Sequence, residues 1–156
     1  MDRFIIEKLI EILFVIFLVL ISIKDFKEKI IPDRYTLGIA ALGTAKILFC
    51  NGDFEKGFIG MGTYPIIFLI IYGYVSDLIK KETIGFGDIK LLGAAGFYMG
   101  YSGIYKLIIL HNLIFISGFL FVLPALLFKK AEKNSEIPFA PFICMGILLY
   151  RYMVKL

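Results

Sequence analysis

The stretch ILFVIFLVLISIKD, residues 12–25, decides the class of fold to which this chain belongs. Residues 12–23 carry no charge, and they extend a largely apolar segment that begins near Ile6. A helix needs about 20 apolar residues to cross a bilayer. The segment therefore predicts a membrane-spanning helix with Asp25 just beyond its end. A carboxylate at membrane depth is costly, so Asp25 is by default interpreted as functional.

The rest of the chain is equally apolar. Of its 156 residues, 60% are hydrophobic and 19% are charged, and the mean hydropathy is +0.87. A soluble domain is closer to half apolar and a quarter charged. The net charge of +4 is modest and the basic residues lie between apolar runs, so we expect a lipid bilayer and no nucleic acid as partner. No hydrophilic stretch is long enough for a second domain, so residues 1–156 are expected to form one transmembrane domain.

The apolar runs predict an all-α integral membrane protein with about six transmembrane helices. The second, fourth and sixth runs are short, and Pro124 predicts a bend or a tilt in the fifth. Residues 1–8 contain acids as well as bases and no cleavage site follows, so the first span is expected to be retained. The predicted spans are Ile6–Ile23, Tyr35–Phe49, Gly57–Leu78, Gly87–Met99, Ile104–Phe128 and Phe139–Val154.

The basic residues between the spans indicate an orientation. Ten of the 17 lie in the loops after spans one, three and five, which places these loops in the cytoplasm and both termini outside. Asp25 then lies at the cytoplasmic end of span one, and Asp88 lies at the cytoplasmic start of span four. Although far apart in sequence, the two carboxylates are expected at similar depth and can converge on one site.

Asp88 closes the tetrad Gly85-Phe86-Gly87-Asp88, which we expect to form a loop at the membrane edge. Non-helical backbone at that depth is tolerated only where protein or water covers it. The glycines permit unusual dihedral angles and leave room for an approaching peptide. A glycine-rich loop with an ordinary N-terminal aspartate explains the tetrad equally well. Further along, Gly96 and Gly100 have the spacing of close helix contacts.

Three aspartates have plainer explanations when each is taken alone. Asp25 is explained as a solvated loop acid that Lys24 and Lys27 neutralise. Asp33 follows Pro32 and precedes an apolar run, so it is expected to cap the second span. Asp77 is expected to be an ordinary interfacial acid.

If Asp25 and Asp88 meet, mutual repulsion leaves the pair with one shared proton. The ionised member can take a proton from an attacking water while the protonated member polarises a scissile carbonyl. This aspartyl-protease chemistry needs no metal and no cofactor. His111 is expected to be a core or interfacial residue near the opposite face, and Cys50 and Cys144 have no metal-binding spacing.

Three segments together resemble the type IV prepilin peptidases. Residues 25–36 are similar to the first-aspartate motif of that family, with its Ile-Pro and a following polar residue. Residues 85–91 are similar to its GxGDxKL motif, and residues 137–142 to the Pro-Phe-x-Pro-Phe stretch before its last helix. The GxGD motif alone is shared with presenilin-type proteases. The order and spacing of all three segments, however, are similar to those of the prepilin peptidases over nearly the whole chain.

The resemblance implies that Asp25 and Asp88 are the catalytic dyad of a GxGD intramembrane aspartyl protease. It also implies supporting or substrate-binding roles for the tetrad glycines Gly85 and Gly87, and for Lys90 and Pro138. The implied reaction removes a short basic leader from prepilin or pseudopilin substrates, on the cytoplasmic side of the inner membrane. The large bifunctional members add a cysteine-rich zinc loop and methylate the new N-terminus. This chain has no such cysteines, so a compact, peptidase-only form is expected.

Two other functions fit part of the pattern. A preflagellin peptidase would share the dyad, although the Ile-Pro after Asp25 favours the prepilin branch. A small proton- or cation-coupled transporter would also place acids beside helix ends. It would favour acids at mid-membrane and often an internal repeat, neither of which the sequence indicates.

Overall fold

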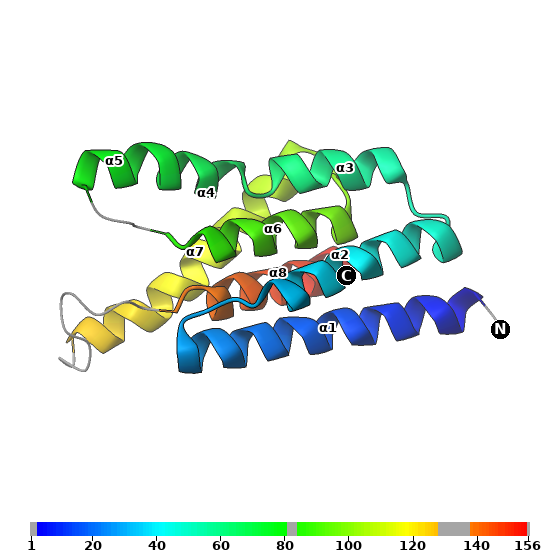
Figure 1. Cartoon of the computed structure of the whole chain (residues 1–156), viewed down its shortest axis with the longest axis horizontal. Helices are drawn as coiled ribbons and strands as arrows, with labels where there is room; N and C mark the ends of the chain where they lie inside the picture. The colour runs from blue at the N-terminus through cyan, green and yellow to red at the C-terminus, as the bar shows by residue number, and fades with distance from the viewer. Residues whose placement is uncertain (1–2, 81–83, 128–137, 156) are drawn as a thin grey trace.

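The computed structural model describes residues 3–80, 84–127 and 138–155, and every element within these ranges is helical (Figure 1). The prediction of an all-helical protein is therefore confirmed. In chain order the elements are α1 (Arg3–Glu28), α2 (Asp33–Cys50), α3 (Phe54–Thr63), α4 (Ile66–Ile70), the π-helix η1 (Ile71–Val75), α5 (Ser76–Ile79), α6 (Phe86–Met99), α7 (Ile104–Leu127) and α8 (Ala140–Lys155).

Helix α1 contains the first predicted span and continues five residues beyond it, from Ile23 to Glu28. It ends there because Lys29 adopts a left-handed conformation, with φ 55°, and Pro32 follows soon after. The N–H of Lys29 donates to the carbonyl of Asp25 at 2.8 Å and closes the last turn. Asp25 therefore lies inside a helix, with only 6% of its surface exposed. Its explanation as a solvated loop acid is wrong.

The third predicted span is a row of short helices. Pro65 separates α3 from α4, because proline has no N–H for the helical hydrogen bond and its ring clashes with the preceding turn. Within the described ranges, two helical stretches are long and apolar enough to cross a membrane, Phe54–Leu78 and Ile104–Pro124. Ala140–Met153 is a shorter apolar helix. The count of six spans stays a prediction.

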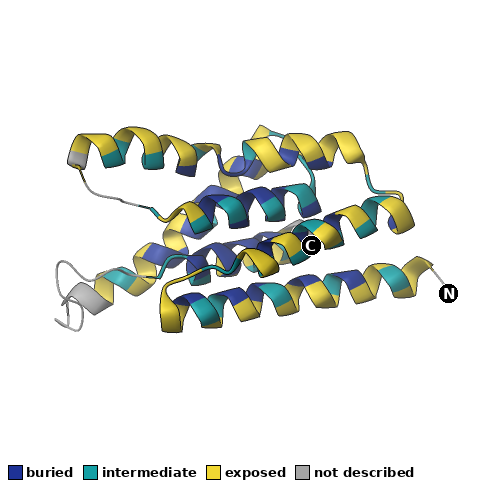
Figure 2. Cartoon of the chain, viewed as in Figure 1, coloured by how far each residue is buried: buried dark blue, intermediate teal, exposed yellow. Residues whose placement is uncertain are grey.

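Helix α6 lies in the middle of the bundle and is largely buried (Figure 2). It packs closely on α2 and α3 and touches α8. The contact with α3 depends on two glycines, since a methyl group on Gly60 or Gly96 would lie 2.3 Å from the carbonyl oxygen of the other. The close helix contact predicted at Gly96 is thus confirmed. Gly100, with φ 73°, ends the helix.

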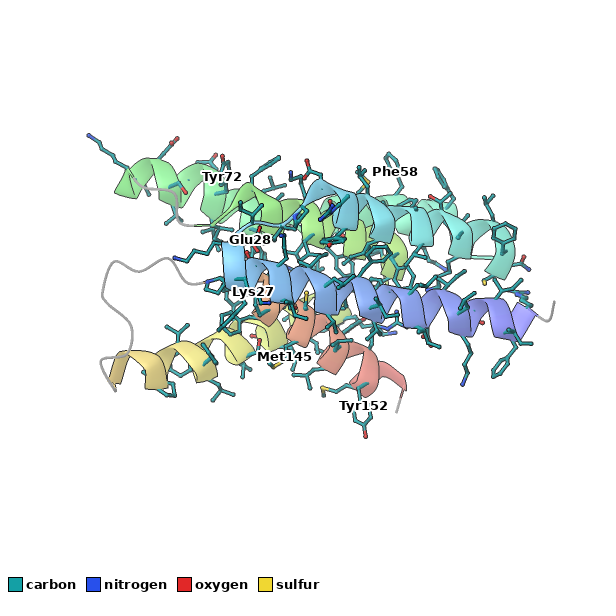
Figure 3. All side chains as sticks on the ribbon, turned by 60° about the horizontal axis from the view of Figure 1, so that its bottom comes forward. Lys27, Glu28, Phe58, Tyr72, Met145 and Tyr152 are labelled. Carbon is teal, nitrogen blue, oxygen red and sulfur yellow. The ribbon has the colours of Figure 1, made fainter. Side chains whose placement is uncertain are left out.

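The end of α1 and the beginnings of α6 and α8 lie at the same end of the bundle (Figure 1). Figure 3 shows Lys27 and Glu28 at this end of α1, with Tyr72 of η1 also at this end. Helix α1 packs mainly on α2 and α8, so these two helices position the end of α1 relative to the beginning of α6. The basic residues Lys81, Lys129, Lys130 and Lys133, used above for orientation, lie outside the described residues.

Candidate active site

Asp25 is a buried acid in the last turns of α1. One oxygen of its carboxylate, Oδ2, accepts a hydrogen bond of 3.0 Å from the backbone N–H of Ala140, the first residue of α8. Burial raises the pKa of the Asp25 carboxyl above its ordinary value, and the hydrogen bond from Ala140 opposes that rise. The carboxylate is therefore directed into the bundle, toward the N-terminus of another helix.

Asp88 is a second buried acid, in the first turn of α6, and it is also 6% exposed. Its carboxylate accepts a hydrogen bond from the backbone N–H of Gly85, the N-cap residue. An acid at this helix position commonly satisfies the N-cap amide. The other oxygen, Oδ1, is buried without a hydrogen-bond partner among the described residues. Capping therefore accounts for one oxygen of Asp88 and leaves the second without a structural role.

The structure brings these two carboxylates together. The negative charge of Asp25 acts directly on Asp88, and both charges act on the thiol of Cys144 in α8. Cys144 is buried, and Ser22 of α1 hydrogen-bonds to it. The sequence analysis found no metal-binding spacing for Cys144 and did not place it beside the acids. Within the described residues, neither Asp25 nor Asp88 has an ion-pair partner, so two acids share one buried space without a neutralising cation.

The two glycines of the tetrad differ in what surrounds them. Gly85 is extended, with φ −72° and ψ 140°, and Gly87 is already helical. Both conformations are open to any L-residue, so the expectation of unusual dihedral angles is wrong. A methyl group on Gly87 would lie 3.1 Å from Cβ of Ile31, whereas one on Gly85 would meet only Oδ2 of Asp88, at 3.6 Å, and the amide of Gly87. A side chain at Gly87 would thus press on Ile31, while Gly85 is exposed and lies beside Asp88.

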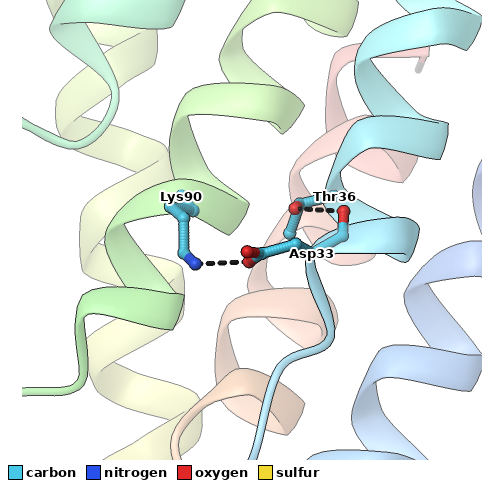
Figure 4. Close-up of polar contacts among 3 residues, drawn as sticks. All are labelled: Asp33, Thr36 and Lys90. Atoms are coloured by element: carbon cyan, nitrogen blue, oxygen red, sulfur yellow. Dashed lines mark hydrogen bonds and ion pairs between the residues drawn. The ribbon is translucent and has the colours of Figure 1, made fainter.

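Lys90 lies on the same helix as Asp88 but forms its ion pair with Asp33, at the beginning of α2 (Figure 4). The hydroxyl of Thr36 donates to the backbone carbonyl of Asp33 at 2.9 Å. The N-cap of α2 is Pro32, and no side chain caps the helix. The prediction that Asp33 caps the second span is therefore wrong, because its carboxylate instead binds a lysine far away in sequence.

Pro138 lies two residues before the amide that binds Asp25, and it is half-buried. The neighbouring ring of Phe139 packs on Phe68 of α4, with 5.7 Å between ring centroids, and on Phe142 at 5.8 Å. These contacts hold the beginning of α8 in place. Ile137, the first residue of the segment that resembles the Pro-Phe-x-Pro-Phe stretch, lies outside the described residues.

Two other polar residues lie apart from this site. Asp77 is exposed on α5, where it lines an open pocket of about 400 Å³ together with apolar residues of α4 and η1. His111 is buried in α7, and its ring nitrogens lie 2.8 Å from the carbonyl of Leu107 and 3.0 Å from that of Tyr64. The prediction of a core histidine is confirmed.

A buried pair of acids can perform general acid–base chemistry. Two nearby carboxylates in a poorly solvated site cannot both ionise easily, so one of them keeps its proton. The pair then offers a base and an acid side by side, which is what addition of water to a carbonyl requires. Gly85 is exposed beside Asp88, and a third reactant can approach Asp88 from this side.

Comparison with known proteins identifies the family. The sequence model of the type IV leader peptidase family matches residues 12–127. The chain is 31% identical over 137 residues to the leader peptidase HopD of Escherichia coli, which covers 85% of this chain and 84% of that protein. It is 30% identical over 139 residues to the prepilin leader peptidase/N-methyltransferase of Xanthomonas campestris, covering 83% of this chain and 45% of that protein.

The corresponding enzyme of Bacillus subtilis is 27% identical over 143 residues, covering 90% of this chain and 54% of that protein. The chain thus spans about half the length of the prepilin leader peptidase/N-methyltransferases that it matches. No solved structure matches it. The matched region includes Asp25, the GFGD tetrad and Lys90, and on this evidence the chain belongs to the type IV leader peptidase family.

Proposed function

We propose that this protein is a membrane-embedded aspartic endopeptidase that removes the leader of prepilin-like proteins, with Asp25 and Asp88 as its catalytic dyad. The observation that carries the proposal is the shared burial of these two acids, neither of which has an ion-pair partner among the described residues. A buried carboxylate that lacks an ion-pair partner is costly, and a second one beside it adds repulsion. Two adjacent buried acids do not stabilise the fold, whereas acid–base catalysis requires them.

The reaction needs only the two carboxylates and one water. The ionised aspartate removes a proton from water as the water oxygen bonds to the scissile carbonyl carbon. The protonated aspartate gives its proton to the carbonyl oxygen, and a tetrahedral gem-diol forms. The carbon–nitrogen bond then breaks as a proton passes to the leaving amine and the second hydroxyl proton returns to the dyad. The products are a carboxyl group on the leader and a new amine, with no metal or cofactor.

The names of the relatives support the substrate class, since they are leader peptidases and prepilin leader peptidases. Gly85 supports the access route: its backbone is extended and a side chain there would point into open space beside Asp88. We assign Gly85 to the approach of the substrate backbone. Gly87 and Pro138 hold the two helix beginnings that carry Asp88 and the Ala140 amide.

The proposed setting is the cytoplasmic edge of the inner membrane, with about six spans. The two acids lie at one end of the bundle, where the predicted cytoplasmic loops begin. This chain aligns with 84% of HopD, which is named a leader peptidase, and this similarity supports the peptidase activity. A short basic leader followed by an apolar helix would present its junction at this depth.

Co-expression with a prepilin-like protein tests the proposal. Asp25→Asn and Asp88→Asn should each reduce leader removal by at least about 100-fold, the usual contribution of a general acid or base. The readout is the size of the substrate on a gel, with membrane levels of the enzyme measured by blotting. Asp77→Asn, which changes an exposed acid on α5, is the matched control and should process normally. Normal processing by either dyad variant would refute the assignment, and proton flux in liposomes would then test the transporter.

A further inference from the structure

The two helices that carry the aspartates are linked by other helices and by a short loop, and they have little direct packing on each other. Helix α1 packs mainly on α2 and α8, and α6 packs mainly on α2 and α3. At the Asp25 end, the chain turns sharply at Lys29 and reaches α2 at Asp33. Contacts that fasten this turn to α6 therefore act, together with the packing of α2 and α8, on the distance between Asp25 and Asp88.

Two contacts fasten it. Ile31 packs on Gly87, so closely that a methyl group on that glycine would lie 3.1 Å from the Ile31 Cβ atom. The carboxylate of Asp33 pairs with Nζ of Lys90, one turn or less from Asp88 (Figure 4). Nζ of Lys90 also stands 5.6 Å from the ring centroid of Phe86, which keeps the lysine at the beginning of α6. We call Ile31, Asp33, Gly87 and Lys90 the clasp.

We infer that the clasp is a positioning device: the Asp33–Lys90 ion pair holds the α1–α2 loop on the GFGD turn and so fixes the geometry of the dyad. This inference rests on the proposed function for its activity readout. Asp33 is not part of the catalytic dyad. Lys90 acts on the position of the dyad through its ion pair with Asp33.

The solvent exposure of the Asp33–Lys90 pair argues against a large contribution to stability. The side chains of Lys90 and Asp33 are 37% and 65% exposed. Ion pairs this exposed contribute about 0–1 kcal/mol. The catalytic rate is more sensitive to the position of the reacting groups, because a displacement of about 1 Å can lower it about 100-fold. A lysine placed to neutralise Asp88 would bind Asp88, yet this one binds an acid on another helix.

The test uses the full-length membrane protein and four versions: the natural chain, Asp33→Asn, Lys90→Met and the reversed pair Asp33→Lys with Lys90→Asp. Each single variant should lower kcat by about tenfold or more, with KM, membrane level and the pH of half-maximal activity unchanged. The reversed pair should recover most of kcat. If Lys90 acted on the dyad by its charge, Lys90→Met would shift the pH profile and the reversed pair would not recover.

A second readout is independent of any substrate. Spin labels on the exposed residues Glu28 and Gly85 report the distance between the end of α1 and the beginning of α6, while Cys50 and Cys144 are buried. The distance distribution should be narrow in the natural chain and the reversed pair, and broader or shifted in the single variants. An unchanged distribution in both single variants overturns the inference. If the natural chain cleaves no prepilin-like protein, the proposed function fails while this distance measurement still decides the clasp.

Discussion

The two ends of this bundle bury acidic side chains in opposite ways. At one end, Asp25 and Asp88 share a buried space and have no ion-pair partner among the described residues. At the other end, Glu11 of α1 pairs with Arg151 of α8. The two clusters are about 21 Å apart along α1, taking ~1.5 Å for each helical residue.

The second cluster is also covered by aromatic rings. The guanidinium of Arg151 stands 5.4 Å from the ring centroids of both Phe14 and Tyr98, which are themselves stacked 3.9 Å apart. A second cation, Nζ of Lys46 in α2, lies 4.8 Å from the ring centroid of Tyr98. This cluster joins α1, α2, α6 and α8, and its acid has a cation as partner. The difference teaches that the fold can pair a partly buried acid with a cation, so the unpaired acids at the first end are there for another reason.

The largest effect on stability is expected where the paired end is broken. Arg151→Met removes the cation and leaves the carboxylate of Glu11 in a half-buried site. The free energy of unfolding should fall by about 2 kcal/mol, between the values for exposed and fully buried pairs. Thermal unfolding in detergent measures this, and adding Glu11→Gln to Arg151→Met should restore most of the loss. Leader removal per folded molecule should stay unchanged, because the cluster lies far from the dyad.

A smaller effect of opposite sign is expected at the unpaired end. Asp88→Asn replaces a buried charge with a neutral side chain that can still accept the hydrogen bond from Gly85. We expect the free energy of unfolding to rise by about 1 kcal/mol, because a desolvated and repelled charge is removed. Asp77→Asn, at an exposed acid, should leave it unchanged in the same assay. A clear loss of stability in Asp88→Asn would mean that the carboxylate stabilises the native fold, and the contrast between the two ends would disappear.

The helical class could be predicted from the sequence, because crossing lipid demands long apolar runs, and the motif residues stand at the ends of these runs. The break at Pro65 and the π-helix after it could not, since residues 57–78 are apolar throughout and their pattern resembles one span. Asp33 was predicted to cap the second span because an aspartate that follows a proline and precedes an apolar run commonly caps a helix. A lysine 57 positions away competes for the same carboxylate, and only the fold brings it there.

Part of the candidate site could not be predicted from the pattern of side chains in the sequence. The group that binds Asp25 is the backbone N–H of Ala140, and any residue except proline supplies such a donor. The Pro-rich segment before α8 marked the right region without indicating which acid it meets. The clustering of Asp25, Asp88 and Cys144 depends on the relative rotation of three helices, which the apolar pattern of α6 does not fix because most of that helix is buried.

The smallest expected effect is a pH dependence of stability that has opposite signs for two aspartates. Asp25 has its pKa raised by burial in the folded chain, so the native state binds more protons than the unfolded state, and stability falls as pH rises through the folded pKa. The melting temperature of Asp25→Asn minus that of the natural chain should therefore grow from pH 4 to pH 7.

Asp53, the exposed N-cap of α3, provides the matched comparison. Its hydrogen bond from the backbone of Lys56 lowers its pKa, so the native state binds fewer protons and the stabilising contribution is lost as pH falls through the folded pKa. The melting temperature of Asp53→Asn minus that of the natural chain should therefore become less positive, or more negative, as pH rises. A difference that stays constant with pH for Asp25→Asn would show that Asp25 titrates as an ordinary solvated acid, and the unpaired end of the bundle would lose its distinguishing property.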